Sequence, residues 1–197
     1  MKRILATVLL LFVLMGSVPA LLVGCAELPD EETVLSEFKA LYERSLEIND
    51  YVFGAGLPAE SYDEDEEADL KTARYITVAS DAKYRTKDDF KAAILTVYSE
   101  DYYKDALENL LFSGYDASTS ISARYKVSGG ELQIDVNNEG KKTTGRFDLS
   151  TAYVSKITST FVTIKADYTD PDGRKIPACA ISMVKTESGW RFDAPSY

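Results

Sequence analysis

The sequence predicts an α+β fold in which N-terminal helices pack on a curved antiparallel sheet. Up to Asp116, apolar residues recur at the spacing of helices, about 3.6 residues. After Asp116 the spacing changes to two, which is typical of strands with one buried face. Helices followed by a run of strands indicate a sheet that carries its helices on one face. Such a sheet curves around the helices, and we expect a conical hollow between the two layers.

The first predicted helix begins after Asp30, whose carboxylate can cap free backbone N–H groups. Glu31 and Glu32 follow in the first turn, where the helix dipole favours negative charge. We expect this helix to end near Asn49, before the helix-breaking run 54–58. Its apolar stripe consists of Val34, Leu35, Phe38, Leu41, Tyr42 and Leu46.

Residues 73–79 are rich in β-forming residues and predict a short strand. Thr86, with Asp89 three residues later, predicts the capped start of a second helix. Ser99 predicts the start of a third helix, which Gly114 ends. The apolar stripes of these two helices are Phe90, Ile94, Val97 and Tyr98, and Ala106, Leu107, Leu110 and Leu111.

The rest of the chain predicts consecutive strands. Alternating apolar residues in 121–127 and 131–136 flank Gly129-Gly130, a pattern that indicates a hairpin. Trp190 and Phe192 lie two residues apart in the last strand, so both should face the helices. The further strands are predicted at 145–149, 152–157, 160–168, 176–185 and 190–193.

The N-terminal segment resembles a bacterial lipoprotein signal peptide. Lys2 and Arg3 precede an apolar run that Pro19 interrupts and that ends in Leu22-Val23-Gly24-Cys25. This ending resembles a lipobox, which implies cleavage after Gly24 and a diacylglycerol on the Cys25 sulfur. The alternative is an ordinary secretory signal or an uncleaved anchor.

The lipobox interpretation gives the predicted organisation of the chain. Residues 1–24 are a signal peptide that is removed, 25–30 a short lipid-anchored tether, and 31–197 a single α+β domain. The location that follows is the extracytoplasmic face of the cell membrane. Two acyl chains are sufficient for stable anchoring.

Composition excludes several classes of function. The removed segment holds two of the 22 basic residues and none of the 32 acidic ones, so the mature charge is −12. Such a charge repels phosphates, and we expect no nucleic-acid partner. The chain has no histidine, which excludes His-based triads and most zinc sites, and we expect no cofactor. Cys179 lies in a predicted apolar strand, and we expect a small buried side chain rather than a reactive thiol.

Residues 63–69 (DEDEEAD) form a block of like charge. Clustered carboxylates are calcium ligands, but the block lacks the glycine turn and the terminal glutamate of an EF-hand. We therefore interpret it as a solvated loop or helix edge, with calcium binding as the alternative.

Two aromatic segments carry a resemblance to a known family. The first runs from Tyr75-Ile76-Thr77-Val78 through the segment 84–90 to Val97-Tyr98-Ser99, and the second is the ending 189–197, GWRFDAPSY. With the element order, they resemble the NTF2-like (cystatin-like α+β cone) superfamily. They are also similar to the IseA-type inhibitors of DL-endopeptidases of Firmicutes, whose targets are NlpC/P60 cell-wall hydrolases. The resemblance covers most of residues 70–197 and implies a non-catalytic binding role in the cell envelope.

Three functions remain open at this point. The first is a non-catalytic envelope binding domain that binds or inhibits a protein such as a cell-wall hydrolase. The second is a cone that binds a small ligand or acts as a histidine-free enzyme with an Asp/Tyr site. The third is an accessory structural lipoprotein. We assign no catalytic residues, because no spacing distinguishes one Asp/Tyr pair from another. The candidates for lining the hollow are Tyr125, Tyr153, Tyr168 and Trp190, with core packing as the alternative for each.

Overall fold

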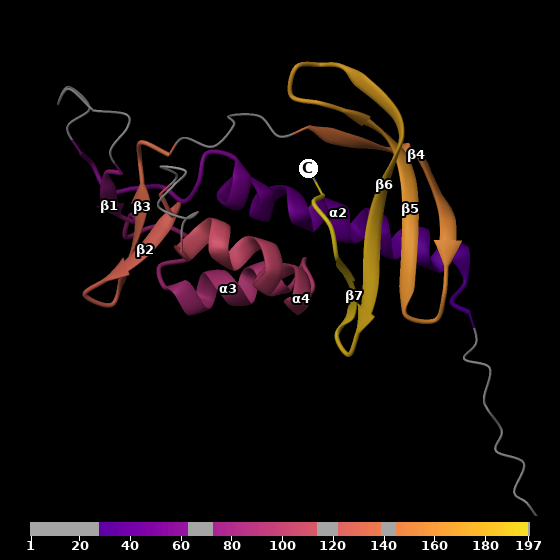
Figure 1. Cartoon of the computed structure of the whole chain (residues 1–197), viewed down its shortest axis with the longest axis horizontal. Helices are drawn as coiled ribbons and strands as arrows, with labels where there is room; N and C mark the ends of the chain where they lie inside the picture. Colours follow the sequence, from indigo (N-terminus) through magenta and orange to yellow (C-terminus); the bar gives the residue numbers. More distant parts are fainter. Residues whose placement is uncertain (1–27, 63–72, 114–121, 139–144, 197) are drawn as a thin grey trace, which may run out of the picture.

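A long helix, α2 (Glu31–Phe53), runs across most of the molecule (Figure 1). The structure is a computed structural model that describes residues 28–62, 73–113, 122–138 and 145–196. The other elements are β1 (Tyr75–Thr77), α3 (Lys87–Leu95), α4 (Glu100–Tyr102), the π-helical segments η1 (Tyr103–Leu107) and η2 (Asn109–Ser113), β2 (Tyr125–Ser128), β3 (Glu131–Asp135), β4 (Arg146–Ile157), β5 (Phe161–Thr169), β6 (Lys175–Thr186) and β7 (Gly189–Phe192). Helices and antiparallel strands together make an α+β fold, as the sequence predicts.

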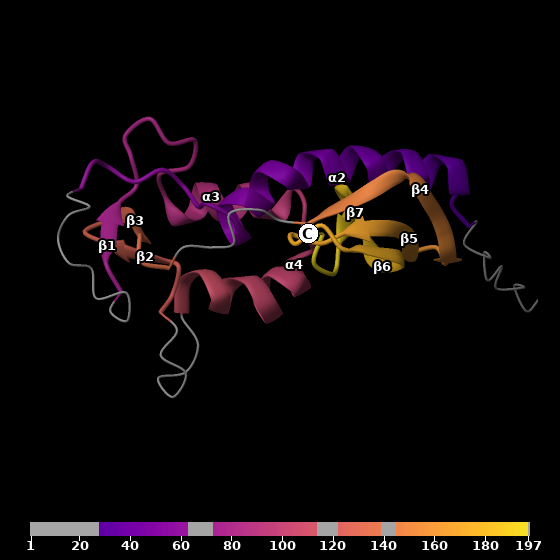
Figure 2. The same ribbon diagram turned by 90° about the horizontal axis from the view of Figure 1, so that it is seen from above.

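In the described residues the strands form two antiparallel sheets rather than the one curved sheet that the sequence predicts. Their orders are β1-β3-β2 and β4-β5-β6-β7. The difference arises because β3 pairs with β1, through Ile76 opposite Ile134, and not with β4. The four-stranded sheet crosses α2, and the three-stranded sheet lies beyond the C-terminal end of α2 (Figures 1 and 2).

The predicted helix starts are confirmed by their caps. The Asp30 carboxylate accepts a hydrogen bond from the Thr33 N–H at 2.8 Å. The Thr86 hydroxyl accepts from the Asp89 N–H at 3.1 Å, and the Ser99 hydroxyl accepts from the Tyr102 N–H at 3.0 Å. Each side chain supplies an acceptor that the first turn of a helix otherwise lacks.

Helix α2 ends at Phe53, one turn later than the sequence predicts. The reason is that Val52, one turn after Ile48, extends the buried stripe past Asn49 and stabilises the last turn by packing. The hairpin of β2 and β3 is confirmed, with Gly129 and Gly130 at its turn. Its predicted buried face is incomplete, because Val127 is 51% exposed near the tip.

Aromatic side chains join α2 to the four-stranded sheet. Phe38 packs edge-on against Phe192 with ring centroids 6.0 Å apart, and Tyr42 packs edge-on against Phe147 at 5.9 Å. Trp190 and Phe192 are both buried, which confirms that they face the helices. Burying such side chains is the main source of stability at this junction.

The prediction for Cys179 is wrong in part. It lies in β6 opposite Ala166, as a strand residue should, but its side chain is half-buried rather than buried. Ala178 before it has a φ of 52°, and the β5–β6 register shifts between Ala166 and Tyr168. This irregularity is the place where the thiol reaches the surface.

Candidate functional site

A pocket lies at the C-terminal end of α2, between the segment 55–62 and the end of β3. Its volume is about 500 Å³. Most of its wall is apolar, and the polar side chains on it come from Tyr62, Asp135 and Asn138. This size and composition are typical of ligand pockets. The other lining residues are Ala55, Gly56, Leu57, Pro58, Ala59, Ile134 and Val136.

Glycines turn the chain out of α2 into the pocket wall. The Gly54 N–H donates to the Asn49 and Asp50 carbonyls at 3.1 and 3.0 Å, and the Gly56 N–H donates to the Asp50 carbonyl at 3.0 Å. Gly56 has a φ of +89°, which favours glycine. A Cβ on Gly56 would lie 2.5 Å from Ile134 Cδ1, so the wall also needs glycine for its close approach to β3.

The same wall is fixed to β1 by backbone hydrogen bonds. The Ala79 N–H donates to the Pro58 carbonyl at 2.8 Å, and the Glu60 N–H donates to the Thr77 carbonyl at 2.8 Å. Ala59 forms a β-bridge with Val78 between them. Because these bonds are all internal to the protein, the pocket is formed before any ligand arrives.

Two buried side chains of the β2 region tie the wall to the sheet. Arg124 is 4% exposed; its Nη2 donates to the Gly54 carbonyl and its Nη1 donates to the Asn138 carbonyl at 3.3 Å. Among the described residues, no ion pair involves Arg124 and its Nε has no hydrogen-bond partner. The bond to Gly54 places its charge at the negative end of the α2 dipole, which offsets part of the cost of burial.

Tyr125 makes the second tie. Its hydroxyl accepts from the Leu57 N–H at 3.0 Å and donates to the Tyr51 carbonyl at 2.7 Å. Burial raises the pKa of Tyr125, and the nearby charge of Arg124 opposes that rise. The hydroxyl therefore stays protonated at neutral pH and serves as a fixed donor and acceptor behind the pocket wall.

The Asp135 carboxylate at the pocket is fully engaged by neighbouring donors. It is 2% exposed, and its Oδ1 accepts from the backbone N–H groups of Arg74 and Asn137 at 2.8 and 3.1 Å. Its Oδ2 accepts from the Ser122 hydroxyl at 2.5 Å. A carboxylate held in this way stabilises the turn after β3 and has little capacity to act as a general base.

The four residues predicted to line a hollow do not meet at one site. Tyr125 is fully buried behind the pocket wall, and Trp190 is buried between β7 and the helices. Tyr168 packs on Phe147 with centroids 5.0 Å apart, and Tyr153 is 48% exposed on β4. None of the four lines the pocket described above or a second pocket, of about 310 Å³, beside the β6–β7 turn. Their placement favours the alternative of core packing for Tyr125 and Trp190.

Other predictions fall outside the described residues. Gly24 and Cys25 of the predicted lipobox and the acidic block 63–69 belong to this group. In the part of the chain that is described, no group of three or more carboxylate or cysteine side chains could hold a metal ion. The same part contains no helix long and apolar enough to cross a membrane.

The pocket itself was missed by sequence reasoning. From the sequence, residues 54–58 are recognisable only as a helix breaker, and Asp135 only as a polar position of a strand. The spacing Gly54-Ala55-Gly56 after an apolar stripe was the available signal, since such glycines mark tight turns or close approach.

No family model and no curated protein matches this chain.

Proposed function

We propose that this protein is a lipid-anchored binding protein of the extracytoplasmic membrane face, and that its pocket binds a ligand without catalysing a reaction. The anchor is the one that Leu22-Val23-Gly24-Cys25 indicates. Four residues separate Cys25 from Asp30, so the start of α2 stays close to the bilayer. The domain follows directly after this tether.

The observation that carries the proposal is that the pocket lies at the C-terminal end of α2, the end opposite the one that follows the proposed tether. Helix α2 has 23 residues, which gives a length of about 34 Å. Its N-terminal end adjoins the tether, and its C-terminal end forms the pocket wall (Figure 1). The helix therefore acts as a spacer that presents the pocket away from the membrane.

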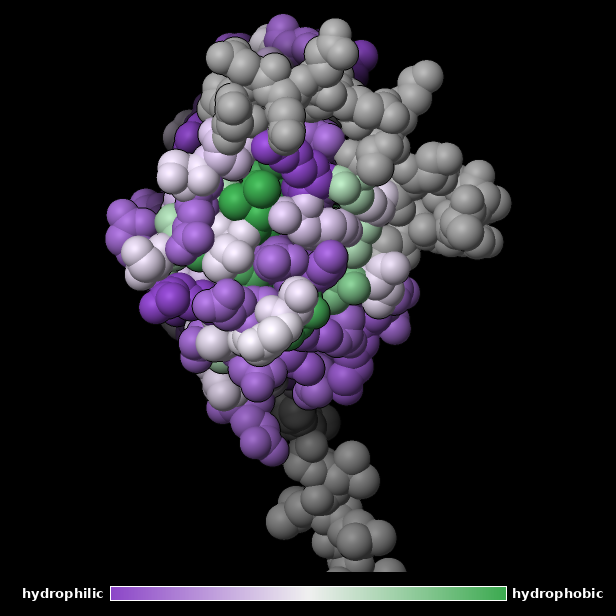
Figure 3. Space-filling view, turned by 90° about the vertical axis from the view of Figure 1, so that its left-hand side faces the viewer, coloured by the Kyte–Doolittle hydropathy of each residue, from purple (hydrophilic) through white to green (hydrophobic). Residues whose placement is uncertain are grey.

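The pocket chemistry favours binding over catalysis. The carboxylate of Asp135 is occupied by three donors, and the hydroxyl of Tyr125 is occupied on both sides. The remaining wall of the pocket is mostly apolar, and Figure 3 shows a few apolar side chains among mainly hydrophilic ones at this end of the molecule. An uncharged small molecule or the apolar side chains of an extended peptide would fit such a surface.

The partner to test first is the one that the sequence resemblance implies. A cell-wall hydrolase or another envelope protein could supply an extended segment with apolar side chains. A free small ligand is the alternative, and a purely structural role is the third candidate. The rigid, preformed wall around Gly56 favours the first two over the third.

Photo-crosslinking distinguishes these candidates. A benzophenone side chain replaces Tyr62, which is 36% exposed and lines the pocket, in the full chain within intact envelopes. The matched control replaces Val127, which is 51% exposed in β2 and is not among the pocket-lining residues. We expect an adduct at position 62 and not at 127, and its mass separates a protein from a small ligand. Equal labelling at both positions, or none at position 62, would contradict the proposal.

A further inference from the structure

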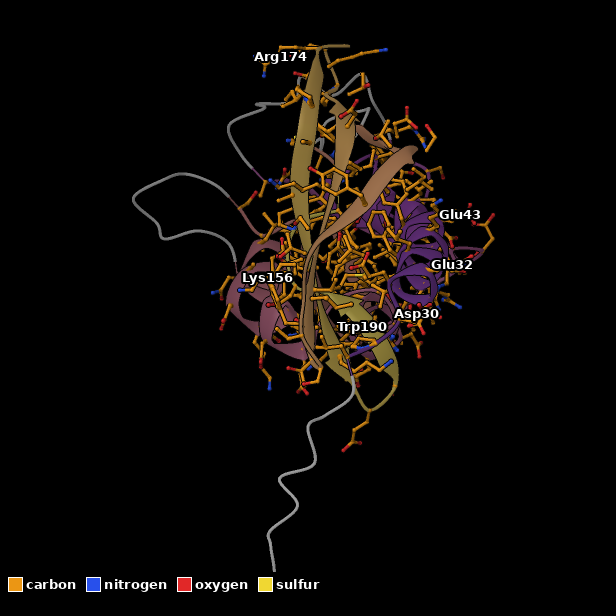
Figure 4. The ribbon with its side chains drawn as sticks, turned by 90° about the vertical axis from the view of Figure 1, so that its right-hand side faces the viewer. Asp30, Glu32, Glu43, Lys156, Arg174 and Trp190 are labelled. Atoms are coloured by element: carbon orange, nitrogen blue, oxygen red, sulfur yellow. The ribbon has the colours of Figure 1, made fainter. Side chains whose placement is uncertain are left out.

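The outward face of α2 is acidic. The helix carries six acidic and two basic residues, a net charge of −4. Its buried residues lie on one side, and Glu32, Glu43 and Glu47 lie on the opposite, exposed side. Figure 4 shows Glu32 and Glu43 pointing away from the four-stranded sheet. Among the described residues, no ion pair involves Glu32 or Glu43.

The four-stranded sheet has the opposite charge. Strands β4 to β7 together carry six basic and two acidic residues, a net charge of +4 in a chain whose net charge is −10. Both acidic residues accept hydrogen bonds from backbone N–H groups of the sheet: Asp148 from Ser150 of the same strand and Asp167 of β5 from Ala178 of β6.

The basic side chains of β4 and β5 lie on the face of the sheet that is turned away from α2. Val162 and Ile164 are buried on the inner face, so Thr163 and Lys165, which alternate with them, lie on the outer face. The register places Lys156 opposite Thr163.

Aromatic side chains accompany these lysines. Tyr153 lies opposite Lys165 in the register, and the Lys156 Nζ lies 5.5 Å from the centre of the Phe161 ring. In Figure 4, Lys156 points to the side opposite Glu32 and Glu43, and Figure 2 shows the sheet with α2 on one side only. We define the outer face as Tyr153, Lys156, Phe161, Thr163 and Lys165.

We propose that this outer face binds the acidic outward face of α2 in a second copy of the chain. Parallel copies then associate side by side, each joining its sheet to the helix of the next. One molecule cannot join its own two faces, because they lie on opposite sides of the fold (Figure 4). Two copies in the same orientation bring Lys156 and Lys165 of one outer face against Glu32 and Glu43 of the next copy's α2. This contact is heterologous, and its repetition produces rows rather than closed dimers.

The tether strengthens this association and gives it direction. This step rests on the proposed lipid anchor, which holds all copies with the start of α2 toward the bilayer. The charged faces then meet laterally within the membrane plane, and confinement raises the effective concentration. The overall negative charge of each copy opposes contact. At physiological ionic strength, however, salt screens repulsion between charges more than about 8 Å apart, whereas the charges on the two facing surfaces attract within that distance.

A zero-length carbodiimide crosslinker tests the contact in membranes that carry the full chain. It joins a lysine to a carboxylate only where the two touch. We expect a ladder of dimers and higher species, with peptides that join Lys156 or Lys165 to Glu32 or Glu43, whereas Glu47 is already paired with Lys83 of its own chain at 2.6 Å. Lys156→Glu with Lys165→Glu should remove at least nine-tenths of the ladder. The control Arg174→Glu reverses a charge at the far end of the sheet, 76% exposed, and should keep the ladder.

Charge exchange between copies gives the decisive result. A tagged copy with Lys156→Glu and Lys165→Glu, expressed with a differently tagged copy that carries Glu32→Lys and Glu43→Lys, should form mixed dimers although neither copy forms a ladder alone. The proposal is overturned by a wild-type chain without a ladder, by a ladder that survives in the lysine variant, or by crosslinks that map to other faces. Fractionation of the same samples reports separately on the anchor, so a failed anchor and a failed contact are distinguishable.

Discussion

The Tyr98 hydroxyl lies 2.5 Å from Asn49 Oδ1 and donates a hydrogen bond to it, with both side chains buried. Ser196 completes the cluster, since its Oγ accepts from Asn49 Nδ2 at 3.0 Å and lies 2.8 Å from the Tyr98 hydroxyl. Three segments that are far apart in the sequence meet here: α2, the α3–α4 connection and the C-terminal end. A satisfied polar cluster in a core fixes one arrangement of the elements that supply it.

The first prediction concerns this cluster. Tyr98→Phe removes the donor to Asn49 Oδ1 and leaves that buried oxygen without its partner. We expect the free energy of unfolding to fall by about 1–3 kcal/mol, measured by urea denaturation. Tyr153→Phe, at an exposed tyrosine, is the control and should change it by less than about 0.5 kcal/mol. Similar losses in both variants would show that the hydrogen bond does not hold the three segments together.

The second prediction concerns Trp190, which is 3% exposed. Trp190→Ala leaves a cavity between β7 and the helices and should lower the free energy of unfolding by about 3–5 kcal/mol. Tyr153→Ala, an exposed aromatic residue on the same sheet, is the matched control. A loss below about 0.5 kcal/mol for Trp190→Ala would mean that the side chain is on the surface.

Local features of the sequence predicted local features of the fold. Asp30, Thr86 and Ser99 cap helices because a side-chain acceptor and the N–H groups it binds are three residues apart. Gly129 and Gly130 form the predicted turn because the turn requires positive φ, which glycine adopts without strain. Such signals depend on neighbours in the chain and are therefore readable from sequence.

Long-range pairing was not readable in this way. Ile76 lies opposite Ile134, and nothing near either residue in the sequence selects the other. The two strands predicted at 145–149 and 152–157 are one strand, β4, with a register shift between Asp148 and Tyr153. This shift, which the sequence does not indicate, places Tyr153 on the outer face. The pocket depends on both kinds of contact, since a Cβ on Gly56 would meet Ile134 and Arg124, which are far from it in the sequence.

The third prediction concerns stability at alkaline pH. Burial raises the pKa of Tyr103 to about 12, and nearby Glu108 and Asp88 add to the rise. In the unfolded chain a tyrosine titrates near pH 10. The stability that comes from burying the protonated Tyr103 is therefore complete below about pH 10 and is lost as pH rises through 12. Tyr103→Phe should therefore reduce the fall in the free energy of unfolding between pH 10 and pH 12. Identical pH profiles for wild type and variant would contradict the assignment.

The same variant has an expected effect at neutral pH. Within the described residues, the buried Tyr103 hydroxyl has no hydrogen-bond partner. Removing it abolishes the cost of burying an unpaired polar group, and Tyr103→Phe should be neutral or stabilising at pH 7. Urea denaturation at that pH measures the difference.

The fourth prediction concerns the anchor. Cys25→Ala removes the thiol that the proposed lipobox would supply for lipidation, so incorporation of a radioactive fatty acid should cease and the protein should leave the membrane fraction. Cys179→Ala is the control and should keep both label and location, because Cys179 lies in β6 within the folded domain. Labelling that persists in Cys25→Ala would refute the lipoprotein interpretation.

The last prediction separates the pocket wall from an ordinary glycine turn. Gly56 and Gly130 have nearly the same φ, +89° and +88°, so alanine at either position costs about 1–2 kcal/mol of backbone strain. Only at Gly56 does the added Cβ meet other atoms: it would lie 2.5 Å from Ile134 Cδ1, whereas nothing lies within 4 Å at Gly130. Gly56→Ala should therefore cost about 1–3 kcal/mol more than Gly130→Ala in urea denaturation. It should also reduce the adduct formed at position 62, because the wall or the Ile134 and Arg124 side chains against it must shift, while Gly130→Ala leaves that adduct unchanged. Equal costs and equal adducts would mean that the close approach of Gly56 to β3 does not shape the binding site.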